Sequence, residues 1–583
     1  MGDDSSTATF RHLLADQWEY QLQDDPLFAT WVGDHRYDHL LPHVREADFA
    51  RRIERLHGFH ARLESIPRDD LSPSDQLNHD LFGRELHNRT QWMEFRAYRM
   101  PISRTSGFHS GFPDLFLEMP FNTVREYENY IARLSAFREY AGEYVEIMRE
   151  GLRGGQVPAR VTLEGVDDTV RTQIVEDPTK SPLDQPFAKF PPSVPTEECE
   201  RLREAGRRAI LTSVVGGYSG LLRFVLDEYL PSARSDIAAA SLPDGRAYYA
   251  SCIYRHTTLE LAPERIHEIG MSEVKRIRAE MEALIRKTGF QGTFREFIEY
   301  LRADPRFYAT TPDALMKETA YVLKRIDGEL PRLFKTLPRT PYGIRAIPDF
   351  KAPGNTTAYY DPPAGDGTKA GFYYVNLYDL KSRPLYEIEA LSLHEAVPGH
   401  HLQLALQQEL GDLPPFRRFT HFTAFIEGWA LYAERLGLEI GFFQDPYSDF
   451  ARLSYEMWRA CRLVVDTGMH ALGWTRQRAI DFMAENTSST LLNITNEVDR
   501  YIAWPGQALA YKMGELKIRE LRGAAEKALR PRFDIREFHD VVLRNGAIPL
   551  DLLEDIAMQW IEEQRGAGTP ESPGAPGEGG ENE

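Results

Sequence analysis

Helical periodicity runs through most of this chain of 583 residues and constrains its fold more than any other feature. Apolar residues recur at three- and four-residue spacing, as they do on the buried face of a helix. Clusters of Pro and Gly separate these segments. The sequence therefore predicts an all-α protein. The predicted helical segments are 10–31, 47–63, 124–152, 197–230, 263–285, 314–330 and a nearly continuous stretch over 385–558.

Two short aromatic runs interrupt the helical pattern. Residues 357–361 and 371–378 are rich in Tyr and Phe and are joined by a turn-rich loop, which predicts a β-hairpin. One interpretation is a small sheet that completes the core. The other is an edge strand to which an extended peptide adds, and in that case we expect Tyr374 to contact the substrate.

Charge and cysteine content exclude several classes of protein. The 69 Lys and Arg residues are outnumbered by 88 Asp and Glu, for a net charge of −19, whereas phosphate binding needs concentrated basic side chains. Cys199, Cys252 and Cys461 lie far apart, so we expect neither a disulfide framework nor a thiolate metal site. The first residues lack the features of a secretion signal, and no apolar run approaches the ~20 residues that cross a bilayer. We predict a soluble, cytoplasmic protein that binds neither nucleic acid nor membrane; its oligomeric state stays open.

The strongest chemical signal is LHEAVPGHHLQ, residues 393–403. In the zinc-peptidase pattern HExxH, two histidines four residues apart share one helix face and the glutamate acts as base. Here His400 follows His394 by six residues, which in a regular helix leaves the two imidazoles about 120° apart. Pro398-Gly399 can distort the helix. We therefore expect a bulged or kinked turn that brings both histidines onto one Zn²⁺, with Glu395 as general base.

His401 is the alternative ligand. Seven residues return it to the face of His394, but about 10 Å along the helix axis. Because a bulge absorbs two extra residues more readily than three, we rank His400 above His401.

A third ligand is expected in EGWALYAE, residues 427–434, which opens the next long helix. Catalytic zinc commonly takes three protein ligands and leaves one position for water. Glu427 is the predicted third ligand, and the small Gly428 beside it lets a neighbouring helix approach closely. Glu434 lies two turns later on the same face, where it can hydrogen-bond a ligand or contact the substrate.

These motifs carry a family resemblance. HEAVPGHHLQ and EGWALYAE are specific, and RYIAWPGQALAYKMG (500–514) and DDPLFATWVGDHRYDHLL near the N-terminus support them. The chain resembles the bacterial domain-of-unknown-function 885 family over nearly its whole length, apart from the tail. That family resembles the helical zinc peptidases that include thimet oligopeptidase, angiotensin-converting enzyme and carboxypeptidase Taq. The resemblance implies a two-lobed, zincin-like helical fold around a deep cleft, partly roofed by N-terminal helices, and hydrolysis of peptide bonds.

The resemblance also bears on the groups around the metal. The helical peptidases often place an acid four residues after the ligand glutamate to orient a histidine; here that position is Leu431, so another group must hold the imidazole. They use a downstream tyrosine to stabilise the oxyanion, which favours Tyr511 or Tyr501.

Other polar groups are candidates for substrate contacts. Gln507 shares a helix face with Tyr511, and Arg500 can pair with a substrate carboxylate, which would favour carboxypeptidase action. His470 on the intervening helix is a further candidate catalytic donor.

We predict an N-terminal helical lobe and cleft roof over 1–335, a metal-site lobe over 336–565 and a disordered acidic tail over 566–583. The predicted function is zinc-dependent hydrolysis of short peptides, of the oligopeptidase or carboxypeptidase type. The alternatives are a zinc amidase that acts on a modified amino acid or non-peptide conjugate, and a peptide-binding protein of the same fold without turnover. The intact Glu395 argues against the last alternative, because a binding protein needs no base there.

Overall fold

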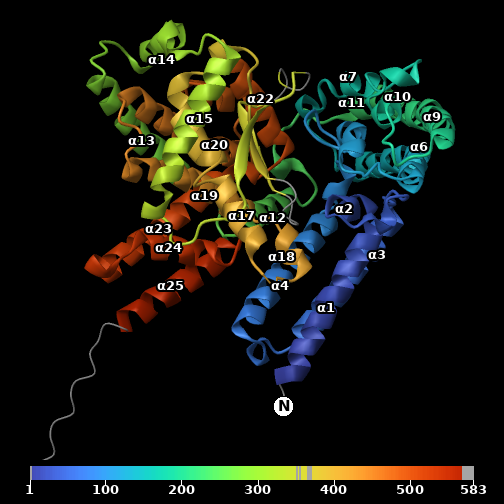
Figure 1. The fold of residues 1–583 in the computed structure, drawn as a ribbon, viewed down its shortest axis with the longest axis horizontal. Helices are drawn as coiled ribbons and strands as arrows, with labels where there is room; N and C mark the ends of the chain where they lie inside the picture. Colours follow the sequence, from blue (N-terminus) through green and yellow to red (C-terminus); the bar gives the residue numbers. More distant parts are fainter. Residues whose placement is uncertain (1–2, 350–351, 353–355, 364–369, 412, 567–583) are drawn as a thin grey trace, which may run out of the picture.

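The fold is seen in a computed structural model (Figure 1), which describes residues 3–349, 352, 356–363, 370–411 and 413–566. Most of these residues are helical, and the described chain holds one small sheet, so the predicted predominance of helix is confirmed. Of the tail predicted to be disordered, all but Gly566 lies outside the described residues.

The N-terminal part of the chain begins with long helices whose ends follow local signals. Thr123 and Glu126 form a capping box at the start of the longest of them, and Gly155 ends it with a φ of +78°. The helices of this part are α1 (Asp3–Asp24), α2 (Pro26–Trp31), α3 (Glu46–Glu64), α4 (Pro73–Glu94), α5 (Phe108–Gly111), α6 (Val124–Gly154), α7 (Val166–Arg171), α8 (Gln185–Ala188), α9 (Thr196–Ala209), α10 (Val215–Phe224) and α11 (Leu230–Ser232).

The remaining helices and the strands follow in chain order. The helices are α12 (Gly245–Thr257), α13 (Pro263–Lys287), α14 (Phe294–Ala303), α15 (Pro312–Glu329), α16 (Ile388–Glu395), α17 (His400–Glu409), α18 (Pro415–Phe419), α19 (Thr423–Leu436), α20 (Pro446–Ala471), α21 (Arg476–Asn486), α22 (Leu491–Ala503), α23 (Ala510–Leu529), α24 (Ile535–Leu543) and α25 (Leu550–Gly566). The strands are β1 (Tyr342–Ala346), β2 (Ala358–Asp361) and β3 (Gly371–Val375).

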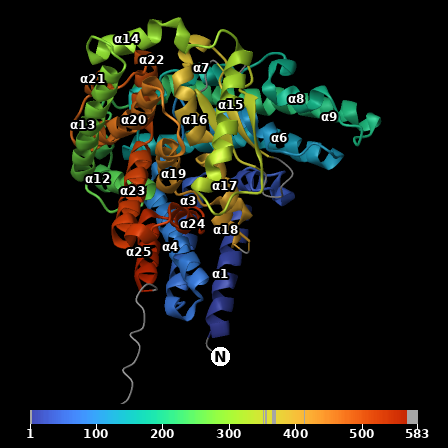
Figure 2. The same ribbon diagram turned by 60° about the vertical axis from the view of Figure 1, so that its left-hand side comes forward.

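The helices gather on two sides of the molecule. Helices α6, α7 and α9 to α11 lie on one side, and α13 to α15 lie with α19, α20 and α23 on the other (Figure 1). Helices α1 and α4 project below the rest in both views (Figures 1 and 2). Gly270 on α13 comes so close to α20 that a Cβ there would lie 2.7 Å from the Cβ of Leu463. Helix α13, which precedes the predicted boundary at residue 335, thus packs against a helix that follows it.

One helical run is longer and more apolar than the sequence analysis expected of any segment. Residues 196–232, which span α9 to α11, are long and apolar enough to cross a membrane by length and composition. This run packs one face against α6, where Gly217 lies so close that a Cβ would sit 2.9 Å from the ring of Phe137. The core helix of a globular protein meets the same criterion, and 44% of the most apolar stretch is buried.

The small sheet contains the predicted hairpin and one further strand. Strands β2 and β3 pair antiparallel, with Tyr359 opposite Tyr374, which confirms the hairpin. Strand β1 pairs parallel to β3 on its other side, so β3 is central and β1 and β2 are the edges. Strand β1 was not predicted from the sequence, and the burial of its side chains does not alternate along the strand.

Candidate metal centre

The helix that carries the two histidines is interrupted over residues 396–399, between α16 and α17. Gly399 makes the break possible, because a Cβ at this position would lie 1.9 Å from the carbonyl oxygen of His394. The indole Nε1 of Trp429 donates a hydrogen bond of 2.8 Å to the carbonyl oxygen of Pro398 and ties the turn to α19. The break expected at Pro398-Gly399 is therefore present.

The break brings together the three predicted metal ligands. The Nε2 atoms of His394 and His400 lie 3.8 and 3.6 Å from the same Oε2 of Glu427. Both distances exceed a normal hydrogen bond. They are close to the separation of about 3.3 Å between ligand atoms in a tetrahedral site with bonds of about 2.0–2.1 Å. All three ligand atoms lie within 4.8 Å of one another, so the donors fit a bound metal ion.

The charges of this cluster suit a cation. Burial acts to raise the pKa of Glu427, but the adjacent His400 and His394 hold it at about 2, so the carboxylate is ionised. Burial lowers the pKa of His394 well below its usual value, whereas Glu427 raises that of His400 against the effect of burial. Metals bind an ionised carboxylate and neutral imidazoles, so an ion that bound here would displace any proton on His400.

Glu434 is the group that holds the first imidazole. Its Oε1 lies 2.8 Å from Nδ1 of His394, with both side chains almost completely buried. Arg459, which the sequence did not reveal, lies with Nη2 3.8 Å from the same Oε1. Burial raises the pKa of Glu434 to about 8, and a cation at the cluster would favour the ionised form that accepts the Nδ1 proton. That bond leaves Nε2 of His394 free to face Glu427.

Glu427 owes its position to close contact between α19 and α23. A Cβ at Gly428 would lie 2.4 Å from Cα of Gly514, and a Cβ at Gly514 would lie 1.9 Å from the carbonyl oxygen of Ala424. The close approach expected beside Glu427 is present, and its partner is a second glycine.

Glu395, the predicted general base, stands at the end of α16, outside the three-ligand cluster. Its side chain is half-buried. Burial raises the pKa of Glu395 to about 7; the charge of Glu427 acts in the same direction, and His400 opposes both. A carboxyl group with a pKa in this range can both accept and return a proton near neutral pH.

Tyr373, and not Tyr374, is the tyrosine of β3 that lies close enough to Glu395 to feel its charge. Tyr373 is fully buried, and its pKa is raised by burial and by the charge of Glu395. Tyr374 points to the other face, where its ring stacks on Tyr359 with the centroids 4.8 Å apart. Alternate side chains of a strand point to opposite faces, and the buried alternation of β3 at 371, 373 and 375 sets which face Tyr374 occupies. This placement speaks against the predicted substrate contact of Tyr374.

His401 lies apart from the cluster, against the sheet. Its Nδ1 is 2.7 Å from the hydroxyl of Tyr360, and its ring packs against Tyr342 with the centroids 4.9 Å apart. Burial lowers the pKa of His401 to about 4, so the ring is neutral. The structure thus places His400, and not the alternative His401, beside His394.

A cavity of about 580 Å³ reaches the cluster at Glu427. Three residues predicted to act on substrate line the same cavity: Arg500, Gln507 and Tyr511. The pKa of Tyr511 is raised by burial and by the charge of Glu427. Side chains of α1 and α4, including those of Trp18, Gln21, Phe82 and Arg89, complete the wall.

Two further predicted residues have other partners. The Tyr501 hydroxyl accepts hydrogen bonds from Arg462 and Trp458 and donates one to Glu497, and it does not line the cavity. His470 is fully buried; its Nδ1 accepts from the amide of residue 239 at 3.1 Å and its Nε2 lies 3.0 Å from the carbonyl oxygen of Tyr501. Both ring nitrogens are hydrogen-bonded to backbone groups. His470 therefore joins three chain segments and has no ring nitrogen free to contact a substrate. Between the two predicted tyrosines, the geometry favours Tyr511.

Comparison with known proteins agrees with the family resemblance. The family described as bacterial protein of unknown function (DUF885) matches residues 26–556. The chain belongs to this family. No curated protein matches the chain.

Two solved structures share the fold. The crystal structure of a candidate lipoprotein from Colwellia psychrerythraea superposes with a TM-score of 0.90 at 29% identity, and the match covers 96% of this chain and 100% of that one. A candidate lipoprotein of unknown function from Shewanella oneidensis gives a TM-score of 0.70 at 16% identity, over 94% and 99% of the two chains. The second likeness concerns the fold alone.

Proposed function

We propose that this DUF885 protein is a zinc-dependent peptidase of short peptides, of the oligopeptidase or carboxypeptidase type, with a zincin-like helical fold. The observation that carries the proposal is the convergence of His394, His400 and Glu427, the last of which lines a cavity, together with a carboxyl group, Glu395, close enough to feel the charges of His400 and Glu427. A purely structural site would close four protein ligands, and among the described residues the cluster has three.

The three ligands would hold Zn²⁺, which when bound supplies a Lewis acid for the scissile carbonyl group and lowers the pKa of water. Glu395 accepts a proton from the attacking water and passes it to the leaving amine. Tyr511, on the wall of the same cavity, donates a hydrogen bond to the oxygen on which negative charge develops. Glu434 positions His394 and does not touch the substrate.

The roof of the cavity limits the substrate. Helices α1 and α4 contribute side chains to a wall that also contains Glu427, so a substrate that reaches the cluster through this cavity passes the side chains of both helices. A folded protein is too wide for such a space, whereas a short peptide in extended form fits it. Arg500 offers a cation for a terminal carboxylate, although its guanidinium already pairs with Glu497 at 2.9 Å.

Metal analysis of the purified full chain, followed by a peptide-library digest read by mass spectrometry, tests the proposal. We expect about one zinc per chain, and loss of zinc in Glu427→Gln and His400→Ala with unchanged helical circular dichroism. His401→Ala is the matched control and should keep its zinc. If the wild-type protein purified after zinc supplementation contains no transition metal, the proposal fails; if it binds zinc but cleaves only non-peptide amides, the amidase alternative replaces it.

We also propose that the protein works in the cytoplasm, which three free cysteines support. The two similar structures are named as candidate lipoproteins, and a lipid anchor would place such proteins at a membrane. Fractionation of cells that carry the native gene separates the two: recovery with the membranes after a salt wash would overturn the cytoplasmic location.

A further inference from the structure

A second cavity of about 680 Å³ adjoins the cavity that reaches the metal cluster. The two share part of their walls, and neither the family nor the catalytic proposal assigns this second space a role. The residues that line both are Asn88, Arg255, His256, Arg500 and Trp504. A substrate that lies in the first cavity can therefore extend into the second past these side chains.

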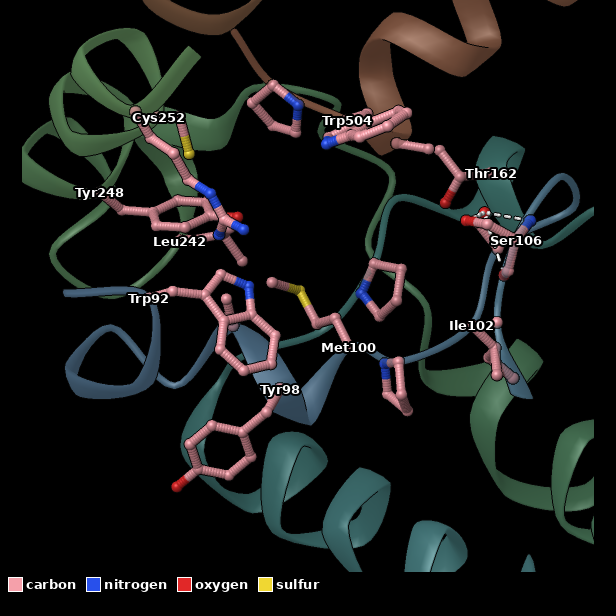
Figure 3. Close-up of a pocket in the computed structure, with 18 of the residues that line it drawn as sticks. Trp92, Tyr98, Met100, Ile102, Ser106, Thr162, Leu242, Tyr248, Cys252 and Trp504 are labelled. Atoms are coloured by element: carbon pink, nitrogen blue, oxygen red, sulfur yellow. Dashed lines mark hydrogen bonds between the residues drawn. The ribbon is translucent and has the colours of Figure 1, made fainter. Parts of the chain in front are cut away.

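The walls of the second cavity are rich in large apolar side chains. Trp92 from α4, Met100 from the segment after it, Tyr248 from α12 and Trp504 from the end of α22 surround the space (Figure 3). Trp504 is 52% exposed, an unusual state for so large an apolar ring. A ring or branched aliphatic group that entered this space would cover Trp504 and leave water, which favours binding.

Arg255 adds a charge at the boundary between the two cavities. Its side chain is exposed, and in the described parts of the chain it has no ion pair or hydrogen-bond partner. The other arginines of the second cavity differ: Arg500 pairs with Glu497, and Arg234 donates to two backbone carbonyl groups. Arg255 is thus the cation whose donors stay available for an anion of the substrate.

We propose that the second cavity binds an apolar side chain, aromatic for preference, of a substrate with a free carboxylate next to that side chain, and that Arg255 pairs with the carboxylate. The inference rests on the proposed peptidase function for the bond that is cut, but the binding itself needs no catalysis. The substrate class that follows is short peptides, or other acylated amino acids, that end in an apolar residue.

Binding of N-acetyl-L-phenylalanine to the full-length protein, measured by isothermal titration calorimetry, tests the proposal. N-acetyl-L-phenylalanine amide lacks the charge, and N-acetylglycine lacks the ring. We expect each to bind about tenfold or more weakly than the parent acid, since either a charge-assisted pair or a buried ring is lost. Arg255→Gln should remove the preference for acid over amide, and Trp504→Ala the preference for phenylalanine over glycine.

Matched controls come from exposed residues outside both cavities. Arg246 lies on the same helix as Arg255, and Trp31 is 56% exposed, close to the value for Trp504. Arg246→Gln and Trp31→Ala should keep both preferences, and circular dichroism should show that all four variants are folded. Equal binding of the three probes by the wild-type protein, or preferences that survive both Arg255→Gln and Trp504→Ala, would overturn the proposal.

Peptide hydrolysis separates this inference from the proposed function. Selective binding of the acid without cleavage of any peptide would keep the second cavity as a binding site and sink the peptidase. Cleavage of peptides with no preference for an apolar carboxyl-terminal residue, together with equal binding of the probes, would support the peptidase function and refute the binding role of the second cavity.

Discussion

The metal-site helices and the helices that roof them are attached to the molecule in different ways. On the metal side the backbones themselves touch: Gly428 lies against Gly514, and Gly399 against the carbonyl oxygen of His394. The roof rests on α18 through side chains. The contacts are Phe82 with Phe416 and Trp18 with Phe419, with ring centroids 5.5 and 5.8 Å apart, and Asn78 with Arg417, joined by a hydrogen bond of 2.7 Å.

The difference distinguishes the predicted ligands, which backbone packing fixes, from helices α1 and α4, whose position side chains determine. Backbone contacts through glycine leave no side chain that could rotate, so we expect the three predicted ligands to be held in place whether or not a metal or substrate is bound. Side-chain contacts can be remade at modest cost, so we expect α1 and α4 to be freer than α19 and α23 to shift when a substrate enters. The following predictions test this contrast, from the largest expected effect to the smallest.

Glu395→Gln should impair peptide cleavage and leave the packing around the predicted ligands unchanged. The amide keeps the size of the side chain but cannot accept a proton, so cleavage of short peptides should fall by about 10²–10⁴-fold, the usual contribution of general base catalysis. Zinc content, measured by mass spectrometry, should stay near that of the wild-type protein. A variant that loses its zinc would make Glu395 a ligand, and one that cleaves at the wild-type rate would remove it from the mechanism.

Gly514→Ala should break the backbone contact between α19 and α23. The new Cβ would lie 1.9 Å from the carbonyl oxygen of Ala424, so the helices must move apart, at a cost of about 1–3 kcal/mol in the free energy of unfolding. Urea unfolding followed by circular dichroism measures it. Gly523→Ala, on the same helix with nothing within 4 Å, is the control and should stabilise the helix by about 1 kcal/mol. Equal behaviour of the two variants would refute the importance of the close contact.

Glu434→Gln should weaken His394 as a ligand and leave all three predicted ligands present. The amide can still hydrogen-bond His394 but no longer carries the charge that strengthens the imidazole as a ligand. Zinc affinity, measured by competition with a chelator, should fall about 10–100-fold, the usual effect of losing such a partner. An affinity equal to that of the wild-type protein would show that Arg459 and burial alone orient the histidine.

Arg84→Gln should have the smallest effect, because it removes a polar contact of the roof. Arg84 on α4 pairs with Asp551 on α25 at 2.6 Å, and the carboxylate is 44% exposed. Partly exposed pairs contribute about 0–1 kcal/mol, so the urea midpoint should hardly change. A loss as large as that of Gly514→Ala would mean that the roof is as firmly fixed as the metal helices.

The sequence predicted local features well and non-local ones poorly. Helical periodicity gave the fold class, and Pro398-Gly399 predicted the break because the geometry of one helix decides it. The roles assigned to Tyr501 and His470 depended on partners far away in the chain, such as Arg462 and the amide of residue 239. No spacing rule reveals such partners.

Other parts of the site were within reach of the sequence but were not read from it. The alternation in β3 distinguishes Tyr373 from Tyr374, since only one set of alternate side chains can face the core.

The parallel pairing of β1 could not be predicted, because YGIRA becomes a strand only beside β3. Arg459 was missed because its partner, Glu434, lies on another helix.

The break between α16 and α17 has a consequence for the stability of the whole molecule. In an unbroken HExxH helix, the two histidines belong to one rigid rod. Here they lie on two helices, and Glu427 lies on a third. An ion at the cluster would act as a cross-link between three separate chain segments, and a ligand that binds only the folded state raises stability with its free concentration. The melting temperature would then serve as a gauge of zinc supply.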